Sequence, residues 1–260
     1  MWEASRRQVI CLQCHEGGPA SGDGRAAEAA VDLAVARPRA AAGGASAQRE
    51  YDKRVGRREQ QVRTQHPKLG GLLLALSKEP VSTRVWAQGA AGERAVAAKL
   101  DELADEHIVA LHDRKMRRPD ATLSKANIDH LAITPAGVWV IDAKTHQGAL
   151  EVRRSGGLFS PRVEALYING RDRTSLVRGL LAQVEAVRNE LDAVHADVAV
   201  RGALCFVGTE LPWFGSSNIA EVPLVGRRGL ARLLRSTGTL AAADREAVAV
   251  FLDRRFPPAA

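Results

Sequence analysis

Two β-rich runs joined by a short turn constrain the fold of this chain more than any other feature. Residues 127–133 and 138–144 are dominated by apolar and β-branched side chains. Pro135 and Gly137 lie between the runs, and these residue types supply the backbone conformations of a tight turn. The pattern therefore predicts an antiparallel hairpin.

The expected hairpin brings charged side chains together. If it closes symmetrically over the turn, Leu131 pairs with Val140, and the same register places Asp129 opposite Asp142. Two directly opposed carboxylates repel each other, so such a pair usually has a cation between them. Mg²⁺ takes oxygen ligands from one or two carboxylates and keeps waters that a phosphate displaces. Lys144 shares the face of Asp142, where it could stabilise charge on a phosphate or orient an attacking water.

Two further polar residues lie on the apolar stripes of expected helices. Glu93 precedes Val96 by three residues, and Gln183 follows Leu180 by three residues. Taken alone, Glu93 is an ordinary helix N-terminal charge and Gln183 an ordinary edge residue. Their occurrence together with the opposed carboxylates and the lysine of the hairpin favours a functional cluster.

After about residue 86, the sequence alternates between helical and strand-like periods. Apolar residues at helical spacing mark a long amphipathic helix over 174–194, and the apolar run 198–207 predicts a buried central strand. The other expected helices cover 89–104, 227–235 and 241–255, and the other expected strands cover 107–114, 149–153 and 221–225. This order of elements predicts a three-layer α/β domain with a mixed sheet.

Composition divides the chain into three parts. Residues 1–48 contain Cys11, Cys14 and an Ala/Gly-rich linker, which we expect to be flexible or marginally helical. Residues 49–85 are expected to form a basic helical arm, and residues 86–258 the compact domain.

The overall composition excludes several classes of protein. The longest apolar run, 70–76, is far shorter than the roughly 20 residues of a membrane-spanning helix, and the N-terminus lacks the apolar region of a secretory signal. Three cysteines are too few for a disulfide framework, so we expect a reducing, cytoplasmic location and no membrane association. The net charge of +7 is compatible with an anionic partner.

Two segments, GAAGERAVAAKL and ANIDHLAITPAGVWVIDAKTHQGAL, together with the helix that carries Gln183, resemble the nuclease-related domain (NERD) family. That family is related to the PD-(D/E)xK restriction-endonuclease-like superfamily. The resemblance covers residues 86–207. It implies a restriction-endonuclease-like core with a central mixed sheet, which binds Mg²⁺ or Mn²⁺ and cuts DNA phosphodiester bonds.

The resemblance also implies roles for individual residues. Glu93 matches the helix acid, Asp129 the first strand acid, Asp142 and Lys144 the D-x-K pair, and Gln183 the polar residue of the following helix. Asp129 and Asp142 would then hold the metal ion, with Glu93 contributing through water. Lys144 would position or activate the attacking water.

The basic arm has two interpretations. Arg54, Arg57 and Arg58 are candidates for contacts with nucleic-acid phosphates, but the same charges are typical of a solvated helix. Tyr51 is the only aromatic residue among 49–66, which argues against a dedicated platform for single strands in the arm.

The cysteines near the N-terminus are also ambiguous. Cys11 and Cys14 have the Cys-x-x-Cys spacing of half a zinc site, which needs four ligands. No second pair is available, since Cys205 lies in an expected core strand. A structural Zn²⁺ site and an orphan remnant of one are the two alternatives.

The leading hypothesis is a Mg²⁺-dependent nuclease that acts on DNA, in DNA processing or repair. The alternatives are a non-catalytic nucleic-acid-binding or scaffolding module, and a metal-dependent phosphoesterase for small substrates. A positive face beside the acidic cluster would favour polymeric DNA, whereas a small closed pocket would favour the phosphoesterase.

Overall fold

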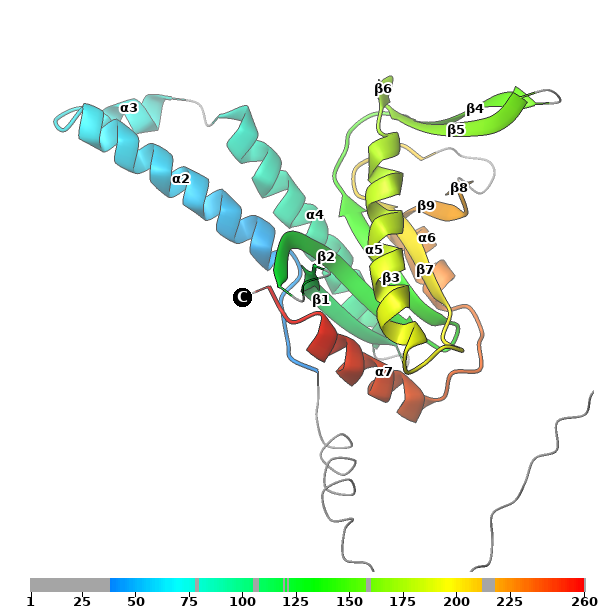
Figure 1. Ribbon diagram of the computed structural model, residues 1–260. Helices are drawn as coiled ribbons and strands as arrows, with labels where there is room; N and C mark the ends of the chain where they lie inside the picture. Colours follow the sequence, from blue (N-terminus) through cyan, green and yellow to red (C-terminus); the bar gives the residue numbers. More distant parts are fainter. Residues whose placement is uncertain are drawn as a thin grey trace, which may run out of the picture. The chain divides into compact units, whose positions relative to one another are not determined.

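The computed structural model (Figure 1) describes residues 38–77, 80–104, 108–118, 120, 122–157, 160–211 and 218–259. Residues 36–260 cluster as one compact unit, to which all the elements below belong. Cys11, Cys14 and most of the expected linker lie outside the described residues, so the zinc site stays a prediction.

A mixed six-stranded sheet forms the centre of this unit, in the order β1-β2-β3-β7-β9-β8. The strands β1, β2 and β3 pair antiparallel, whereas β3–β7 and β7–β9 pair parallel and β8–β9 pairs antiparallel. The strands are β1 (Val109–Arg117), β2 (Leu123–Thr134), β3 (Gly137–Lys144), β7 (Val200–Phe206), β8 (Asn218–Ile219) and β9 (Val222–Gly226). The predicted α/β architecture with a mixed sheet is confirmed.

The β2–β3 hairpin has the register expected from its sequence. Leu131 pairs with Val140, and the pairing continues through Thr134 and Gly137 at the turn. Gly137 has a φ of 116°, and a Cβ atom there would lie 2.3 Å from the carbonyl oxygen of Ala199. Only glycine fits both the left-handed backbone and this close approach, so the turn is fixed by its residue type.

Helices cover both faces of the sheet. Alternate residues of β3 point to opposite sides: Val138 and Val140 pack into a core shared with α5 and α7, whereas Trp139 and Ile141 pack into a core shared with α4 and α6. Figure 1 shows α5 crossing one face of β3 and β7. These helices are α4 (Val81–Ala104), α5 (Thr174–Asp192), α6 (Arg227–Leu234) and α7 (Ala242–Arg255). The result is the expected three-layer core.

Two helices precede this core. The helix α2 (Ala45–Gln65) contains the first part of the basic arm and packs against α4, and the short helix α3 (Gly70–Leu76) packs against α2. The helix α4 begins eight residues before the expected start at 89. Val81 and Val85 in this first part are 67% and 58% exposed, and the buried residue between them is the polar Thr83. Apolar periodicity therefore gives no signal there.

A second, three-stranded sheet follows β3 in the chain. It has the order β4-β5-β6 and is antiparallel throughout. Its strands are β4 (Leu150–Gly157), β5 (Ser160–Ile168) and β6 (Arg171–Asp172). Only the start of β4 was expected, because residues 154–157 are polar or glycine and lack strand alternation. The strand β5 was not predicted, although it contains Val163, Leu166 and Ile168. Within the described ranges, none of the helices combines the length and apolarity needed to cross a membrane.

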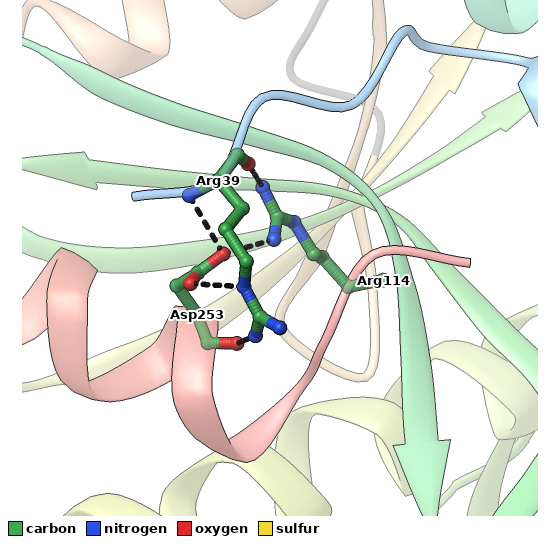
Figure 2. A network of polar contacts seen from close by, with 3 residues as sticks. All are labelled: Arg39, Arg114 and Asp253. Carbon is green, nitrogen blue, oxygen red and sulfur yellow. Dashed lines mark hydrogen bonds and ion pairs between the residues drawn. The ribbon is translucent and has the colours of Figure 1, made fainter. Parts of the chain in front are cut away.

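A buried ionic network ties the segment before α2 to the core (Figure 2). Arg114 of β1, which is 1% exposed, pairs with Asp253 of α7 and donates a hydrogen bond of 2.6 Å to the carbonyl oxygen of Arg39. Arg39 in turn places its Nε atom 2.8 Å from Asp253. Burial lowers the pKa of Arg114 from its ordinary value, and the neighbouring carboxylate of Asp253 opposes this. Asp253 therefore compensates a cation that has little access to water.

This network predicts unequal losses of stability on replacing its central carboxylate, Asp253, and its exposed member, Arg39. Replacing Asp253 by Ala leaves the buried guanidinium of Arg114 without a counter-ion, and we expect a loss of about 3–5 kcal/mol in the free energy of unfolding. Arg39→Ala is the control, because the side chain of Arg39 is 55% exposed, and it should cost about 1 kcal/mol or less. Urea denaturation at pH 7 measures both, and equal costs would contradict this account of the network.

Candidate active site

Three predicted site residues meet where β2 and β3 run side by side. The ladder between these strands pairs His130 with Ile141, one step before Asp129 and Asp142. The Oδ2 atom of Asp129 accepts a hydrogen bond of 3.0 Å from the backbone N–H of Ala143, and the ammonium group of Lys144 forms an ion pair with Asp142. The structure thus brings Asp129, Asp142 and Lys144 together.

The electrostatics of these residues follow from their burial and proximity. Burial raises the pKa of Asp129 well above its ordinary value, and repulsion from the carboxylate of Asp142 raises it further. Burial acts to lower the pKa of Lys144, but the carboxylates of Asp142 and Asp129 outweigh it and raise that pKa. Two carboxyl groups therefore share one ammonium group, and the site favours additional positive charge.

Glu93 lies on α4 and is electrostatically coupled to the same residues. Burial, followed by repulsion from Asp113, raises the pKa of Glu93 to about 7, while Lys144 acts to lower it and Asp142 to raise it. In the described part of the chain, no group of three or more His, Cys, Asp or Glu side chains is arranged to hold a metal ion. Glu93 thus interacts electrostatically with Asp142 but does not form a three-acid metal site with Asp129 and Asp142.

Close backbone approaches fix the position of Glu93. A Cβ atom at Gly92 would lie 2.5 Å from the Cγ2 atom of Thr145, which directly follows Lys144. A Cβ atom at Gly44, just before α2, would lie 3.2 Å from the Cβ atom of Glu93. The absence of side chains at these two glycines lets α4 contact both the end of β3 and the start of α2.

Gln183 lies on α5, one residue before Val184. Val184 is in contact with the backbone of β7, because a Cβ atom at Gly202 would lie 2.8 Å from it. The Oε1 atom of Gln183 is buried and accepts no hydrogen bond from any described residue. A buried amide oxygen of this kind has capacity for a water or a ligand.

A cleft of about 640 Å³ opens beside the acids, between α2, α4, β1 and β2. Four acidic and four basic residues line this cleft. Its charged lining residues are Glu50, Glu93, Asp113, Asp129, Arg49, Lys53, Lys115 and Lys125, and its other lining residues are Ser46, Ala47, Trp86 and Asn127. Asp129 connects this cleft to Asp142 and Lys144.

Asp113 is a buried acid of the cleft that the sequence did not single out. It interrupts β1 with a φ of 50°, a left-handed conformation that Asp adopts more readily than most residues. Its carboxylate accepts hydrogen bonds from the backbone N–H of Ser46 at 2.8 Å, from the hydroxyl group of Ser46, and from the side-chain amide of Asn127 at 3.0 Å. A carboxylate at a helix N-terminus is favourable, so Asp113 anchors the start of α2 to the sheet.

The basic residues proposed from the sequence are partly engaged elsewhere. Arg54 lies 2.8 Å from Glu50 and over the ring of Trp86, and Arg58 donates a hydrogen bond of 2.6 Å to the hydroxyl group of Ser77. Arg57 is exposed. Arg54, Arg57 and Arg58 are not among the described residues that line the cleft. Lys115 and Lys125, which do line it, come from strands whose polar ends gave no sequence signal.

A buried histidine pair supports the hairpin from the opposite side. The Nδ1 atoms of His112 and His130 lie 2.9 Å apart, and the Nε2 atom of His112 lies 2.9 Å from Asp101 of α4. Burial lowers the pKa of His130 well below its ordinary value. This pair joins β1, β2 and α4 and leaves the carboxylate site to other residues.

Comparison with known families bears directly on this site. Residues 88–207 match the family model described as "Nuclease-related domain". This stretch is therefore similar to the nuclease-related domain family. The matched range contains all five residues that the motif comparison selected, Glu93, Asp129, Asp142, Lys144 and Gln183, whereas α2 and its part of the cleft lie outside it. Neither the curated proteins nor the solved structures gave a match to the chain.

The contact between Gly92 and Thr145 gives a test of how α4 is positioned. We expect Gly92→Ala to lower the free energy of unfolding by about 1–3 kcal/mol, because the new methyl group overlaps the Cγ2 atom of Thr145. Adding Thr145→Ser removes that atom and should restore much of the loss. Gly89→Ala is the matched control: nothing lies within 4 Å of its Cβ position, so it should be neutral or stabilise by up to about 1 kcal/mol.

Chemical denaturation of the four proteins measures these differences. If Gly92→Ala were as stable as Gly89→Ala, the close packing of α4 on the end of β3 would be contradicted.

Proposed function

We propose that this protein is a Mg²⁺-dependent nuclease that hydrolyses DNA phosphodiester bonds, in DNA processing or repair. One observation carries the proposal: inside the stretch that is similar to the nuclease-related domain family, two neighbouring carboxyl groups, Asp129 and Asp142, share a single ammonium group, Lys144. This combination of one cation and two hard oxygen ligands is typical of sites that handle phosphate esters.

The donor set fits the implied metal ion. Carboxylate oxygens are the ligands that Mg²⁺ and Mn²⁺ prefer, and Mg²⁺ is commonly held by only one or two of them. Asp129 and Asp142 would hold the ion, with Glu93 contributing through water. When bound, the ion would polarise the scissile phosphate and lower the pKa of a coordinated water. An ion here would also relieve the repulsion that raises the pKa of Asp129.

The remaining residues of the site have complementary roles. Lys144 stays charged because the carboxylates of Asp142 and Asp129 raise its pKa, so its ammonium group can stabilise negative charge that develops on the phosphate. The same group can donate a hydrogen bond that orients the attacking water. The unpartnered Oε1 atom of Gln183 can accept a hydrogen bond from a water.

The cleft favours a polymeric substrate over a small phosphate ester. Arg49, Lys53, Lys115 and Lys125 line it beside Asp129, and cations in this arrangement attract a polyanionic backbone. A phosphoesterase for small substrates would need cations close around a single phosphate, whereas these four come from α2, β1 and β2.

Cleavage assays with isosteric variants test the proposal. We expect the chain to nick or degrade plasmid and single-stranded DNA with Mg²⁺ or Mn²⁺ but not with EDTA. Asp142→Asn and Lys144→Gln should each lower the rate by roughly 10²-fold or more, because each removes a charge that acts on the transition state. Asp192→Asn and Lys68→Gln alter exposed residues elsewhere and should leave the rate unchanged.

Two results would contradict the proposed nuclease activity. One is metal-dependent cleavage that survives Asp142→Asn and Lys144→Gln, since the activity would then come from another site or a contaminant. The other is DNA binding without cleavage that neither substitution alters, which is the behaviour of a non-catalytic binding module.

A further inference from the structure

Three lysines of the cleft have no role in the proposed hydrolysis. Lys53 of α2, Lys115 of β1 and Lys125 of β2 all line it, and none of them forms an ion pair with a described residue. Two of the four acidic residues that line the same cleft are bound to other partners: Glu50 to Arg54, and Asp113 to Ser46 and Asn127. The other two, Glu93 and Asp129, belong to the proposed acidic site. Unpaired cations that converge on one cavity attract an anion.

These lysines lie on two opposing walls. Lys53 is on α2. On the other wall, Lys115 of β1 pairs with Asn127 of β2, and Lys125 precedes Asn127 by two residues on that strand. Asn127 and Asp129 line the cleft between them. A chain of phosphates held by both walls would therefore pass beside Asp129, the residue that leads to the carboxylate pair.

Trp86 is the aromatic residue among the described residues that line the cleft. Its side chain is 37% exposed, although an indole ring of this size is usually well buried. The guanidinium carbon of Arg54 lies 5.2 Å from the ring centroid, and Arg54 is itself held by Glu50 at 2.8 Å. A cation thus lies over the Trp86 ring, and Trp86 also lines the cleft.

An exposed aromatic ring beside unpaired lysines is a combination that suits single-stranded nucleic acid. Lysines contact the backbone, and unpaired bases stack on the ring without regard to sequence. In a duplex the faces of the bases are already stacked on one another, so the ring of Trp86 would have no partner. The aromatic residue therefore discriminates between the two forms of DNA.

We propose that the cleft between α2 and the β1–β2 strands binds a single-stranded segment of DNA, with Lys53, Lys115 and Lys125 on its phosphates and Trp86 stacked on a base. This inference rests on the proposed function for the choice of DNA as the ligand. It also makes α2, which lies outside residues 88–207, part of the substrate site. The hydrogen bonds from Ser46 to Asp113 hold this wall in place.

Binding measured without catalysis tests the inference. The probe is a fluorescent single-stranded oligonucleotide, with a duplex of the same sequence as comparison, titrated with full-length protein in EDTA at several salt concentrations. The variants are Trp86→Leu, Trp86→Phe and the triple variant Lys53→Gln, Lys115→Gln, Lys125→Gln. The matched control is Lys68→Gln, Arg228→Gln, Arg232→Gln, which removes the same charge from exposed positions outside the cleft.

The two kinds of contact should respond differently. Trp86→Leu keeps apolar volume but loses the π face, so it should weaken single-strand binding by about 5- to 100-fold with little change in the salt dependence. Trp86→Phe should retain most of the affinity. The cleft triple variant should reduce the slope of log K against log salt by about 2, and the control triple variant by much less.

Tighter binding to the duplex, or equal affinity of Trp86→Leu and the wild type for the single strand, would overturn the inference. So would equal losses in the two triple variants, because the charge effect would then be diffuse. If binding depends on Trp86 but the protein never cleaves DNA, the single-strand inference is supported and the proposed nuclease activity is contradicted. If cleavage requires Asp142 but binding does not depend on Trp86, the nuclease activity is supported and the single-strand inference is contradicted.

Discussion

The repulsion between two neighbouring carboxyl groups is the constraint on which the site depends. Asp129 and Asp142 lie side by side because the β2–β3 hairpin closes over a turn that only glycine can complete. One ammonium group, Lys144, compensates them in part. The repulsion between the carboxyl groups lowers the stability of the fold. Destabilising arrangements of this kind are typical of sites that bind a cation or a reacting group.

The surrounding layers hold this arrangement in place. Both faces of β3 are covered by helices, so the strand cannot shift without disturbing two cores. The contact of Gly92 with Thr145 sets α4 against the end of β3, and the carboxylate of Asp113 sets α2 against β1. Two segments distant in the sequence, α2 and the β1–β2 strands, thereby form one cleft beside the catalytic acids proposed here.

The sequence was sufficient for elements whose pattern is local. The hairpin register followed from symmetric closure over one turn, and the stripe from Leu176 to Leu191 defined α5 because that helix has a single buried face. The role of Asp113 was not predicted, because it depends on the left-handed backbone of Asp113 itself and on the packing of α2 against β1. The place of Lys115 and Lys125 in the cleft was not predicted for a similar reason, because a polar strand end lines a cleft only when another element packs opposite it.

Direct titration with Mn²⁺ tests the central claim, that Asp129 and Asp142 together form a divalent-cation site. Electron paramagnetic resonance of free Mn²⁺ gives the amount bound by the wild type, by Asp129→Asn, by Asp142→Asn and by the exposed control Asp192→Asn. The account predicts saturable binding by the wild type and the control, and a loss of at least roughly 10-fold in affinity in each of the other two variants. Mn²⁺ binding of equal strength in all four proteins would contradict it.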